Sequence, residues 1–396
     1  MKRSLYIGAA FILVAFGVGQ IAIEKTTATQ GRGGIRAPVF KVDPLWPKPL
    51  PNHWVLGSVT GVAVDAQDHI WITHRGADSL GNNEKGAILN PPTGCCVPAP
   101  QVLEFDQAGN LLSHWVGPGE GYEWPQSTGG ISIDHKGNVW IAAAGQPEPV
   151  AGRGQTGAPA VPRPQDAHVI KFSVSRMIQF LLQIGRAGKV EGSDSKTGLN
   201  RPASVRVDPA TNEAYVADTG NRRIVVFDAD TGAYKRHWGA YGEKPDDANL
   251  GPYDPNAPPA KQFRTASCVA IAKDGLVYVC DRQNDRIQVF QKDGKFVKEA
   301  FVSKTTLGDG SVWDIAFSHD PQQRFLYVAD GYDKKVFILW RETLEIVSSF
   351  GDGGRMPGQF YGVGSIAVDS KGNIYTGETY EGKRVQKFVY KGLGPN

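Results

Sequence analysis

The stretch that decides the fold lies in the middle of the chain and reads Pro202-Ala-Ser-Val-Arg-Val-Asp208, Asn212-Glu-Ala-Tyr-Val-Ala-Asp218 and Asn221-Arg-Arg-Ile-Val-Val-Phe-Asp228. Its three runs are short and rich in β-branched residues, and turn residues separate them. This pattern predicts three strands joined by tight turns. Such a unit cannot bury its own apolar faces, so a chain that holds one copy is expected to repeat it.

The same unit occurs six times along the chain. Its first strands are the runs that begin at Gly61, Gly130, Pro202, Cys268, Asp314 and Ser365. Most copies add a fourth strand, for example residues 233–238. Six such units can bury their faces against one another in a ring. The sequence therefore predicts an all-β fold, a six-bladed β-propeller with four-stranded antiparallel blades. The alternative is a β-sandwich with accidental similarity between strands, and the recurrence of Asp and Gly in phase disfavours it.

The overall composition agrees with one turn-rich β domain and excludes one class of partner. The 396 residues include 48 Gly and 26 Pro, and no long helical period is visible. The formal net charge is +3, and no basic stripe with interleaved aromatic residues is present. Binding of nucleic acid is therefore not expected.

The N-terminus has the composition of an export signal. Lys2 and Arg3 precede an apolar run over residues 5–23, as in the charged and apolar regions of such signals. The run is also just long enough to span a bilayer. We therefore expect residues 1–28 to be a signal peptide or an N-terminal membrane anchor, with the propeller periplasmic or secreted. Contact with a membrane is expected through this segment alone, and only if it stays uncleaved.

A short leader and the propeller follow this segment. Residues 29–39 are expected to form a flexible leader, and residues 40–392 the propeller. Within the propeller, residues 40–47 (Phe-Lys-Val-Asp-Pro-Leu-Trp-Pro) are expected to lie against the last blade and help to close the ring.

Export would let disulfides persist among the four cysteines. In a hairpin of matching register Cys268 lies opposite Cys280, so the two form either a cross-strand disulfide or two buried thiols. Cys95 and Cys96 are adjacent and either form a vicinal disulfide or stay reduced. No pair has CxxC spacing, which disfavours a thiolate zinc site.

Three long insertions interrupt the repeats, at residues 76–101, 145–165 and 241–261. Insertions of this length in a compact domain are commonly functional, and the first two leave the face where the central funnel opens. The third carries Asp246, Asp247 and Asp254, which form either a calcium site or a solvated acidic turn.

The mouth of the funnel is lined by residues just before the first strand and just after the second strand of each blade. Six polar side chains there are predicted to bind a ligand: Arg75, Asp78, Asn221, Arg282, Asp330 and Tyr332. Arg75 and Arg282 follow the second strand on blades one and four, across the ring from each other. Two guanidinium groups at one cavity would suit a carboxylate, which each can bind through two hydrogen bonds.

Each of these side chains also has a local alternative. An aspartate after the second strand can tie its own turn through backbone N–H groups. An arginine there can pair with a neighbouring carboxylate, for example Arg282 with Asp285.

The repeats resemble NHL repeats, and residues 59–391 as a whole resemble the lyase domain of peptidylglycine α-amidating enzymes. The resemblance rests on Gly61-Val-Ala-Val-Asp65 before His74-Arg75-Gly76, on Arg201-Pro202, and on Asp281-Arg282-Gln-Asn284. It implies an enzyme that splits a peptidyl-α-hydroxyglycine into a peptide amide and glyoxylate. In that family three histidines hold a central zinc, with a tyrosine and arginines nearby, and Arg75 and Arg282 match the arginines.

The sequence departs from that family at the zinc site. The three positions that correspond to the histidines hold Gly129, Ser267 and Gly364. The expected tyrosine after the second strand of blade three is also missing, although Asp330-Gly331-Tyr332 follows that strand in blade five. His74 and His168 are the remaining histidines that could approach the funnel. We therefore expect no metal at these positions and no cofactor, with zinc or calcium implied by the resemblance alone.

These observations predict an exported propeller that has lost the zinc chemistry and binds a small acidic or peptide-like ligand. One alternative is an active amidating lyase, a carbon–nitrogen lyase, with substitute metal ligands. Its catalytic candidates are Arg75, Arg282 and Tyr332. A second alternative is a protein-interaction platform that uses the rim of the ring.

Overall fold

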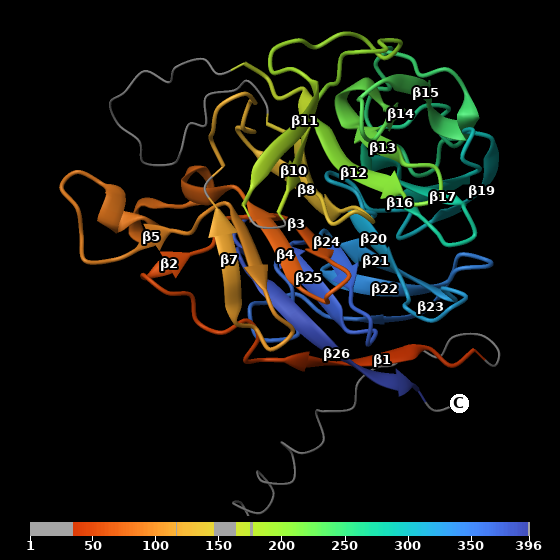
Figure 1. Ribbon diagram of the computed structural model, residues 1–396. Coiled ribbons are helices and arrows are strands. Elements are labelled where there is room, and N and C mark those ends of the chain that lie inside the picture. The colour runs from red at the N-terminus through yellow and green to blue at the C-terminus, as the bar shows by residue number, and fades with distance from the viewer. Residues whose placement is uncertain (1–34, 116, 146–163, 175–176, 395–396) are drawn as a thin grey trace, which may run out of the picture.

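The computed structural model describes residues 35–115, 117–145, 164–174 and 177–394. They form six four-stranded antiparallel sheets arranged in a ring (Figure 1), which confirms the predicted six-bladed propeller. The predicted signal or anchor over residues 1–28 lies outside the described residues. Within the part of the chain that the structure describes, no helix is both long and apolar enough to cross a membrane.

The first three blades follow the chain in order. Blade one consists of β3 (Val59–Val64), β4 (Ile70–His74), β6 (Val102–Phe105) and β7 (Leu111–Trp115). Blade two consists of β8 (Thr128–Ile133), β9 (Val139–Ala143), β10 (His168–Ser173) and β11 (Gln179–Gly185). Blade three consists of β12 (Pro202–Asp208), β13 (Glu213–Asp218), β14 (Arg223–Asp228) and β15 (Tyr234–Trp238).

The last three blades complete the ring. Blade four consists of β16 (Ala266–Ile271), β17 (Val277–Asp281), β18 (Arg286–Phe290) and β19 (Phe296–Phe301). Blade five consists of β20 (Asp314–Phe317), β21 (Phe325–Asp330), β22 (Lys335–Trp340) and β23 (Glu345–Phe350). Blade six consists of β24 (Val363–Val368), β25 (Ile374–Glu378), β26 (Val385–Leu393) and β1 (Pro38–Asp43).

Short 3-10 turns and two short strands lie on the face where the funnel opens. The insertion in blade one holds the 3-10 turns η1 (Gly76–Ser79), η2 (Asn82–Glu84) and η3 (Gly86–Ile88). Its strand β5 (Val97–Pro98) pairs in parallel with β2 (Trp54–Val55). The turns η4 (Thr219–Asn221), η5 (Ala240–Gly242) and η6 (Arg282–Asn284) follow strands of blades three and four.

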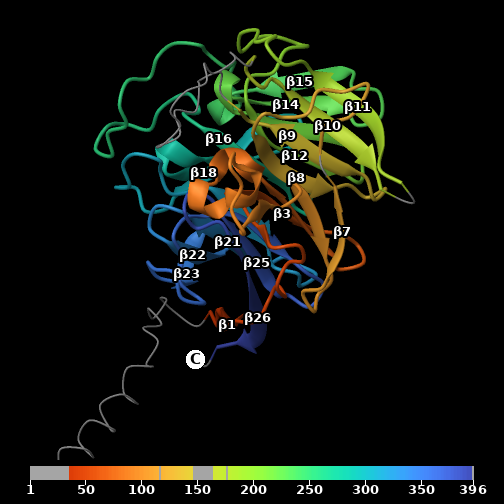
Figure 2. The same cartoon turned by 90° about the vertical axis from the view of Figure 1, so that its left-hand side faces the viewer.

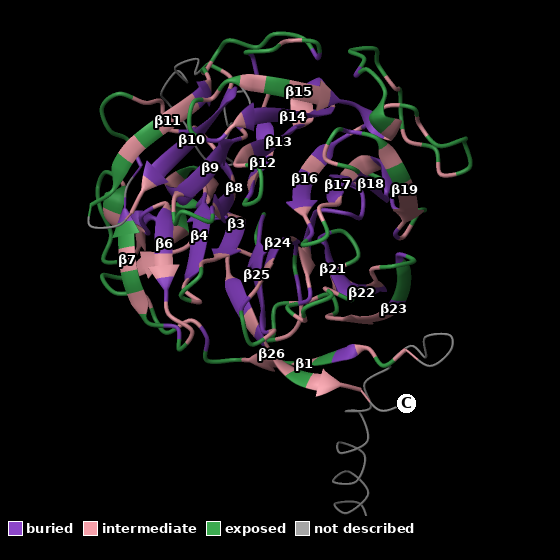
Figure 3. Cartoon of the chain, turned by 45° about the vertical axis from the view of Figure 1, so that its right-hand side comes forward, coloured by how far each residue is buried: buried purple, intermediate pink, exposed green. Residues whose placement is uncertain are grey.

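Neighbouring blades share their apolar cores. Between blades three and four, Tyr215 and Val226 pack in one cluster with Val279 and Phe290. Figure 3 shows the consequence: the inner and middle strands are mostly buried, whereas the outer strands β7, β11 and β23 alternate between exposed and partly buried residues. A single blade would leave these side chains in water, so the ring is the smallest unit that buries them.

The N-terminal strand closes the ring. Strand β1 pairs antiparallel with β26, with Phe40 opposite Tyr390, and two views show the two strands side by side (Figures 1 and 2). The predicted closing segment is therefore found at the last blade. The strand begins at Pro38, because its register with β26 extends to Leu393.

The two cysteine pairs are bonded in the structure. Cys268 lies opposite Cys280 in the pairing of β16 with β17, as the hairpin register predicts, and the two form a disulfide. Cys95 and Cys96 form a vicinal disulfide in the insertion of blade one. The described cysteines thus supply no free thiolate to a metal.

Ring closure depends on the inward face of β1, and two residues on opposite faces of this strand test it. The Phe40 ring lies 5.2 Å from that of Phe350 and 5.5 Å from that of Tyr327. We predict that Phe40→Ala lowers the free energy of unfolding by about 2 kcal/mol, because these aromatic contacts are lost. Val39 is 42% exposed, so Val39→Ala should cost less than about 0.5 kcal/mol. Urea denaturation measures both, and equal losses would contradict a closing role for Phe40.

Candidate functional site

A cavity of about 200 Å³ lies at the centre of the ring, where the first strands begin. Every blade contributes to its lining: Val59, Thr60, Arg75, Thr128, Gly129, Gly130, Ala144, Arg201, Ala203, Thr219, Thr265, Ser267, Arg282, Trp313, Gly364 and Thr379. Three of these residues are arginines. Among the described residues of the lining there is no aspartate, glutamate, histidine or cysteine. The cavity is therefore cationic, with hydroxyl groups as its other polar side chains.

Arg75 is positioned by the histidine that precedes it. His74 is fully buried, and its Nδ1 accepts hydrogen bonds from the backbone N–H groups of Gly57 and Gly76, at 3.1 and 3.0 Å. Its Nε2 therefore carries the proton and donates to Pro100 O at 2.8 Å. Burial lowers the pKa of the His74 imidazole to about 4, so this ring stays neutral. It fixes the backbone on both sides of Arg75 and leaves no nitrogen for a metal.

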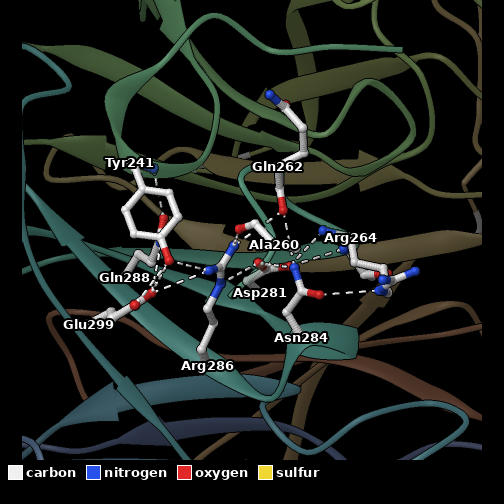
Figure 4. A network of polar contacts seen from close by, with 10 residues as sticks. Tyr241, Ala260, Gln262, Arg264, Asp281, Asn284, Arg286, Gln288 and Glu299 are labelled. Carbon is white, nitrogen blue, oxygen red and sulfur yellow. Dashed lines mark hydrogen bonds and ion pairs between the residues drawn. The ribbon is translucent and has the colours of Figure 1, made fainter. Parts of the chain in front are cut away.

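Arg282 is positioned by a buried network in blade four (Figure 4). It lies in η6, between Asp281 and Asn284. The Asp281 carboxylate accepts hydrogen bonds from Asn284 Nδ2 at 2.7 Å and from Arg286 Nε at 2.8 Å, and both charged side chains are fully buried. Its other oxygen accepts the backbone N–H of Arg264 at 2.8 Å. This network fixes both ends of the turn that presents Arg282 to the cavity.

Blade three contains the same network in the same positions. Asn221 Nδ2 and Arg223 Nε both donate to Asp218 Oδ2, at 2.8 Å each. The side chains of Arg223 and Asp218 are fully buried. The motif Asp-x-x-Asn-x-Arg is therefore a structural element of these two repeats. The Asn221 side chain is part of it, since its Nδ2 donates to Asp218.

The two funnel arginines are partly buried, and their Nε atoms are buried without a hydrogen-bonding partner among the described residues. Arg75 Nε and Arg282 Nε are inaccessible to solvent, and neither bonds to any described residue. Burial lowers the pKa of Arg75 and of Arg282 below the ordinary value, and the positive charge of Arg75 lowers that of Arg282 further. Both groups remain cations. The cavity thus holds two charges that the surrounding protein only partly compensates.

The surroundings of Arg282 differ from the predicted local pairing. Its Nη2 lies 4.0 Å from Asp309 Oδ1, and its guanidinium stacks 4.5 Å from the Trp313 ring. The carboxylate of Asp285 accepts the backbone N–H of Ser311 instead. Tyr380 completes this side of the rim, where its hydroxyl donates to Asp309 Oδ2 at 2.8 Å.

Arg201 is a third cationic residue that sequence reasoning missed as a site residue. It lines the cavity directly before β12, with φ = 50°. Its backbone N–H donates to Asp166 O at 3.1 Å, and burial lowers its pKa. The signal was its place immediately before a first strand, the position that lines the funnel in every blade.

The structure brings together two of the six predicted ligand-binding residues. Arg75 and Arg282 line the cavity, whereas its described lining does not include Asp78, Asn221, Asp330 or Tyr332. Asp78 is exposed in η1, and Tyr332 is 49% exposed. Asp330 is fully buried, and its Oδ1 accepts the backbone N–H groups of Tyr332 and Asp333. Asp330 therefore has the alternative role predicted above, because it stabilises its own turn through backbone hydrogen bonds.

Comparison with known proteins agrees with the repeat pattern. The NHL repeat family matches residues 199–227 and 263–290, within blades three and four. This chain is an NHL-repeat β-propeller. It is 26% identical over 249 residues to peptidyl-glycine alpha-amidating monooxygenase A of Xenopus laevis, and 27% identical over 248 residues to the rat enzyme. These alignments cover 62% and 61% of this chain but 22% of each relative, so the chain spans less than a quarter of their length.

Among solved structures, the propeller is similar to a catalytically inactive virginiamycin B lyase from Staphylococcus aureus with quinupristin. The TM-score is 0.47, the sequence identity is 13%, and 89% of each chain is covered.

The lining of the propeller's cavity does not fit a zinc ion. Gly129, Ser267 and Gly364, which stand where the sequence resemblance predicts the histidines, all line it. The Ser267 hydroxyl is bonded to the backbone carbonyls of Val312 and Trp313, at 3.1 and 3.0 Å. Zinc in proteins takes thiolate, imidazole or carboxylate ligands, and the described lining supplies none of them. His168, the other candidate, is directed to Glu123 O at 2.7 Å.

Blade five departs from the buried network of its neighbours. At the positions of the Asn and Arg that satisfy Asp218 in blade three, it has Asp333 and Lys335. Asp330 Oδ2 is consequently buried without a hydrogen-bonding partner in the described part of the chain. Burial, with the nearby charge of Asp333, raises the pKa of Asp330 to about 8. Asp285, one blade away, is also fully buried, and burial raises its pKa to about 7.

The raised pKa of Asp330 predicts a pH-dependent loss of stability. The folded protein keeps this proton where the unfolded chain has lost it, so stability falls as the pH rises from about 4 to about 8. We predict that Asp330→Asn raises the free energy of unfolding by about 2 kcal/mol at pH 9 and has little effect near pH 4. Asp218→Asn is the matched control in blade three and should destabilise at both pH values, because Arg223 loses its partner. Thermal unfolding across this pH range measures both, and a destabilised Asp330→Asn at pH 9 would contradict the account.

Proposed function

We propose that this propeller is exported and binds the carboxylate of a small or peptide-like ligand in its central cavity. The observation that carries this proposal is the pair of partly buried arginines that line the cavity, Arg75 and Arg282, whose buried Nε atoms have no partner among the described residues. A buried charge without a partner is unfavourable, and a carboxylate that accepts two parallel N–H bonds relieves that cost.

The remaining lining supports a ligand of limited size. Hydroxyl groups of Thr60, Thr128 and Ser267 line the cavity beside the arginines. A volume of about 200 Å³ holds roughly six or seven water molecules, at about 30 Å³ for each. That space suits the carboxyl end of a longer ligand, such as the terminal glycine of an N-acylglycine or a peptide. The rest of such a ligand would extend past Trp313 and Tyr380 at the rim.

The relation to amidating enzymes favours a second candidate, an active lyase with substitute metal ligands. Against it stands the donor set, because no imidazole, thiolate or carboxylate lines the described cavity. The resemblance implies arginines near the site in that family, and Arg75 and Arg282 match them in sequence. Loss of zinc chemistry with retention of the arginines is therefore consistent with a binding protein.

Binding of hippurate, an N-acylglycine, tests the proposal. We predict that the full-length protein binds it, and that Arg75→Gln and Arg282→Gln each weaken binding about tenfold to a hundredfold. The reason is that each substitution removes charge-assisted hydrogen bonds worth about 1.5–3 kcal/mol. Arg324→Gln is the matched control, since Arg324 is exposed and pairs with Asp320 outside the cavity. Isothermal titration calorimetry measures all four proteins, and equal affinities would contradict the proposal and favour an interaction at the rim.

A parallel assay separates binding from lyase activity. Zinc-supplemented protein is incubated with a peptidyl-α-hydroxyglycine, and glyoxylate is measured against a zinc-only control. Folded protein that releases no glyoxylate supports a binding function. Release above the control that disappears in Arg75→Ala would establish the lyase in place of the binding protein.

A further inference from the structure

Blade one carries a cluster of metal-ligating side chains outside the central cavity. Asp65 follows β3, His69 precedes β4 and Glu104 lies on β6, three neighbouring strands in Figure 3. His69 Nδ1 lies 2.8 Å from Glu104 Oε1 and 3.6 Å from Asp65 Oδ2. One ligand atom from each residue falls within 4.8 Å of the other two. We call these three residues the blade-one cluster.

Neighbouring groups hold the two carboxylates in place. Asp65 Oδ1 accepts the backbone N–H groups of Gln67 and His69, at 2.9 and 2.8 Å, and Trp71 Nε1 donates to Asp65 Oδ2 at 2.9 Å. The Ser113 hydroxyl donates to Glu104 Oε2 at 2.5 Å, which leaves Oε1 directed at the imidazole. Such outer hydrogen bonds are what orients the ligands of metal sites in proteins.

Blades two and six have other side chains at the positions that correspond to His69 and Glu104. At the position of His69, blades two and six have Asn138 and Asn373, each of which donates to the preceding aspartate. In the register of Glu104, opposite the aromatic residue of the second strand, they have Lys171 and Lys387.

Each of these lysines lies over its aromatic ring, Lys171 at 5.2 Å from the Trp140 centroid and Lys387 at 5.6 Å from that of Tyr375. Two blades therefore place a lysine over the aromatic ring of the second strand, where Lys171 bonds to Ala229 O and Asp230 and Lys387 bonds to Gln107 O. Blade one has instead a second carboxylate and an imidazole at this place, so a bound cation would restore the charge that the lysines supply in the sister blades.

We propose that the blade-one cluster binds a divalent transition metal ion of the zinc class through His69 Nδ1, Asp65 Oδ2 and Glu104 Oε1. Ligands about 2.0–2.1 Å from a tetrahedral zinc lie roughly 3.3 Å apart, and the two contacts of His69 bracket this value. One imidazole with two carboxylates is a donor set that zinc takes in proteins.

The site has room for a further ligand and lies apart from the funnel. The His69 side chain is 34% exposed, whereas those of Asp65 and Glu104 are 9% and 14% exposed. Water can therefore take the fourth position from the side of the imidazole. The ion ties together the ends of β3, β4 and β6 and so stabilises blade one, and the cluster shares no residue with the cavity lining.

Zinc binding to the full-length, chelator-stripped protein tests this proposal by isothermal titration calorimetry and thermal unfolding. We expect the wild type to bind one equivalent with micromolar or tighter affinity and to unfold at a higher temperature with zinc. His69→Asn and Glu104→Lys give blade one the side chains of blades two and six, so both should fold. Each should weaken binding by roughly a hundredfold. Arg324→Gln, outside both the cavity and the blade-one cluster, is the control and should bind zinc like the wild type.

Two results would overturn the proposal: no zinc bound by the wild type at micromolar concentrations, or unchanged binding by His69→Asn. If Glu104→Lys fails to fold, as judged by circular dichroism, Glu104→Gln replaces it and the same loss of affinity is expected. Hippurate binding plays no part in this readout, so failure here leaves the proposed carboxylate site untouched.

Discussion

The buried ion pair between an aspartate at the end of a second strand and an arginine on the third strand is the interaction on which the site depends. In blade four, Asp281 and Arg286 are fully buried and 2.8 Å apart, and Asn284 bonds to the same carboxylate oxygen. Removing one partner of such a pair typically costs about 3–5 kcal/mol. The pair fixes the turn that carries Arg282, so the position of a functional side chain follows from a structural one.

The contrast between two kinds of arginine supports the proposed binding site in the cavity. Arg223 and Arg286 are as deeply buried as any side chain of the ring, and aspartate and backbone carbonyls satisfy them. Arg75 and Arg282 have no comparable set of acceptors, and their Nε atoms are unpartnered in the described chain. A fold that neutralises its structural arginines so completely leaves these two for a partner from outside. Trp313, stacked on Arg282, holds one of them in place.

The sequence predicts most of the fold because the repeats impose one register on all blades. It also predicts Arg75 and Arg282, since their place after a second strand decides that they face the funnel. It does not separate them from Asn221 and Asp330, which follow the same strands but turn back into the local network. The distinction depends on which side chains hydrogen-bond within their own turn. The sequence does not give this, because it requires the hydrogen-bond geometry of the structure. The blade-one cluster was missed because its members, Asp65, His69 and Glu104, meet through cross-strand register.

The most direct measurement of the central claim is a crystal structure of the propeller with hippurate bound. The account predicts electron density for the carboxylate between the guanidinium groups of Arg75 and Arg282, within hydrogen-bonding distance of at least one nitrogen of each. An empty central cavity at saturating hippurate, or hippurate bound at the rim with both guanidinium groups unchanged, would contradict it.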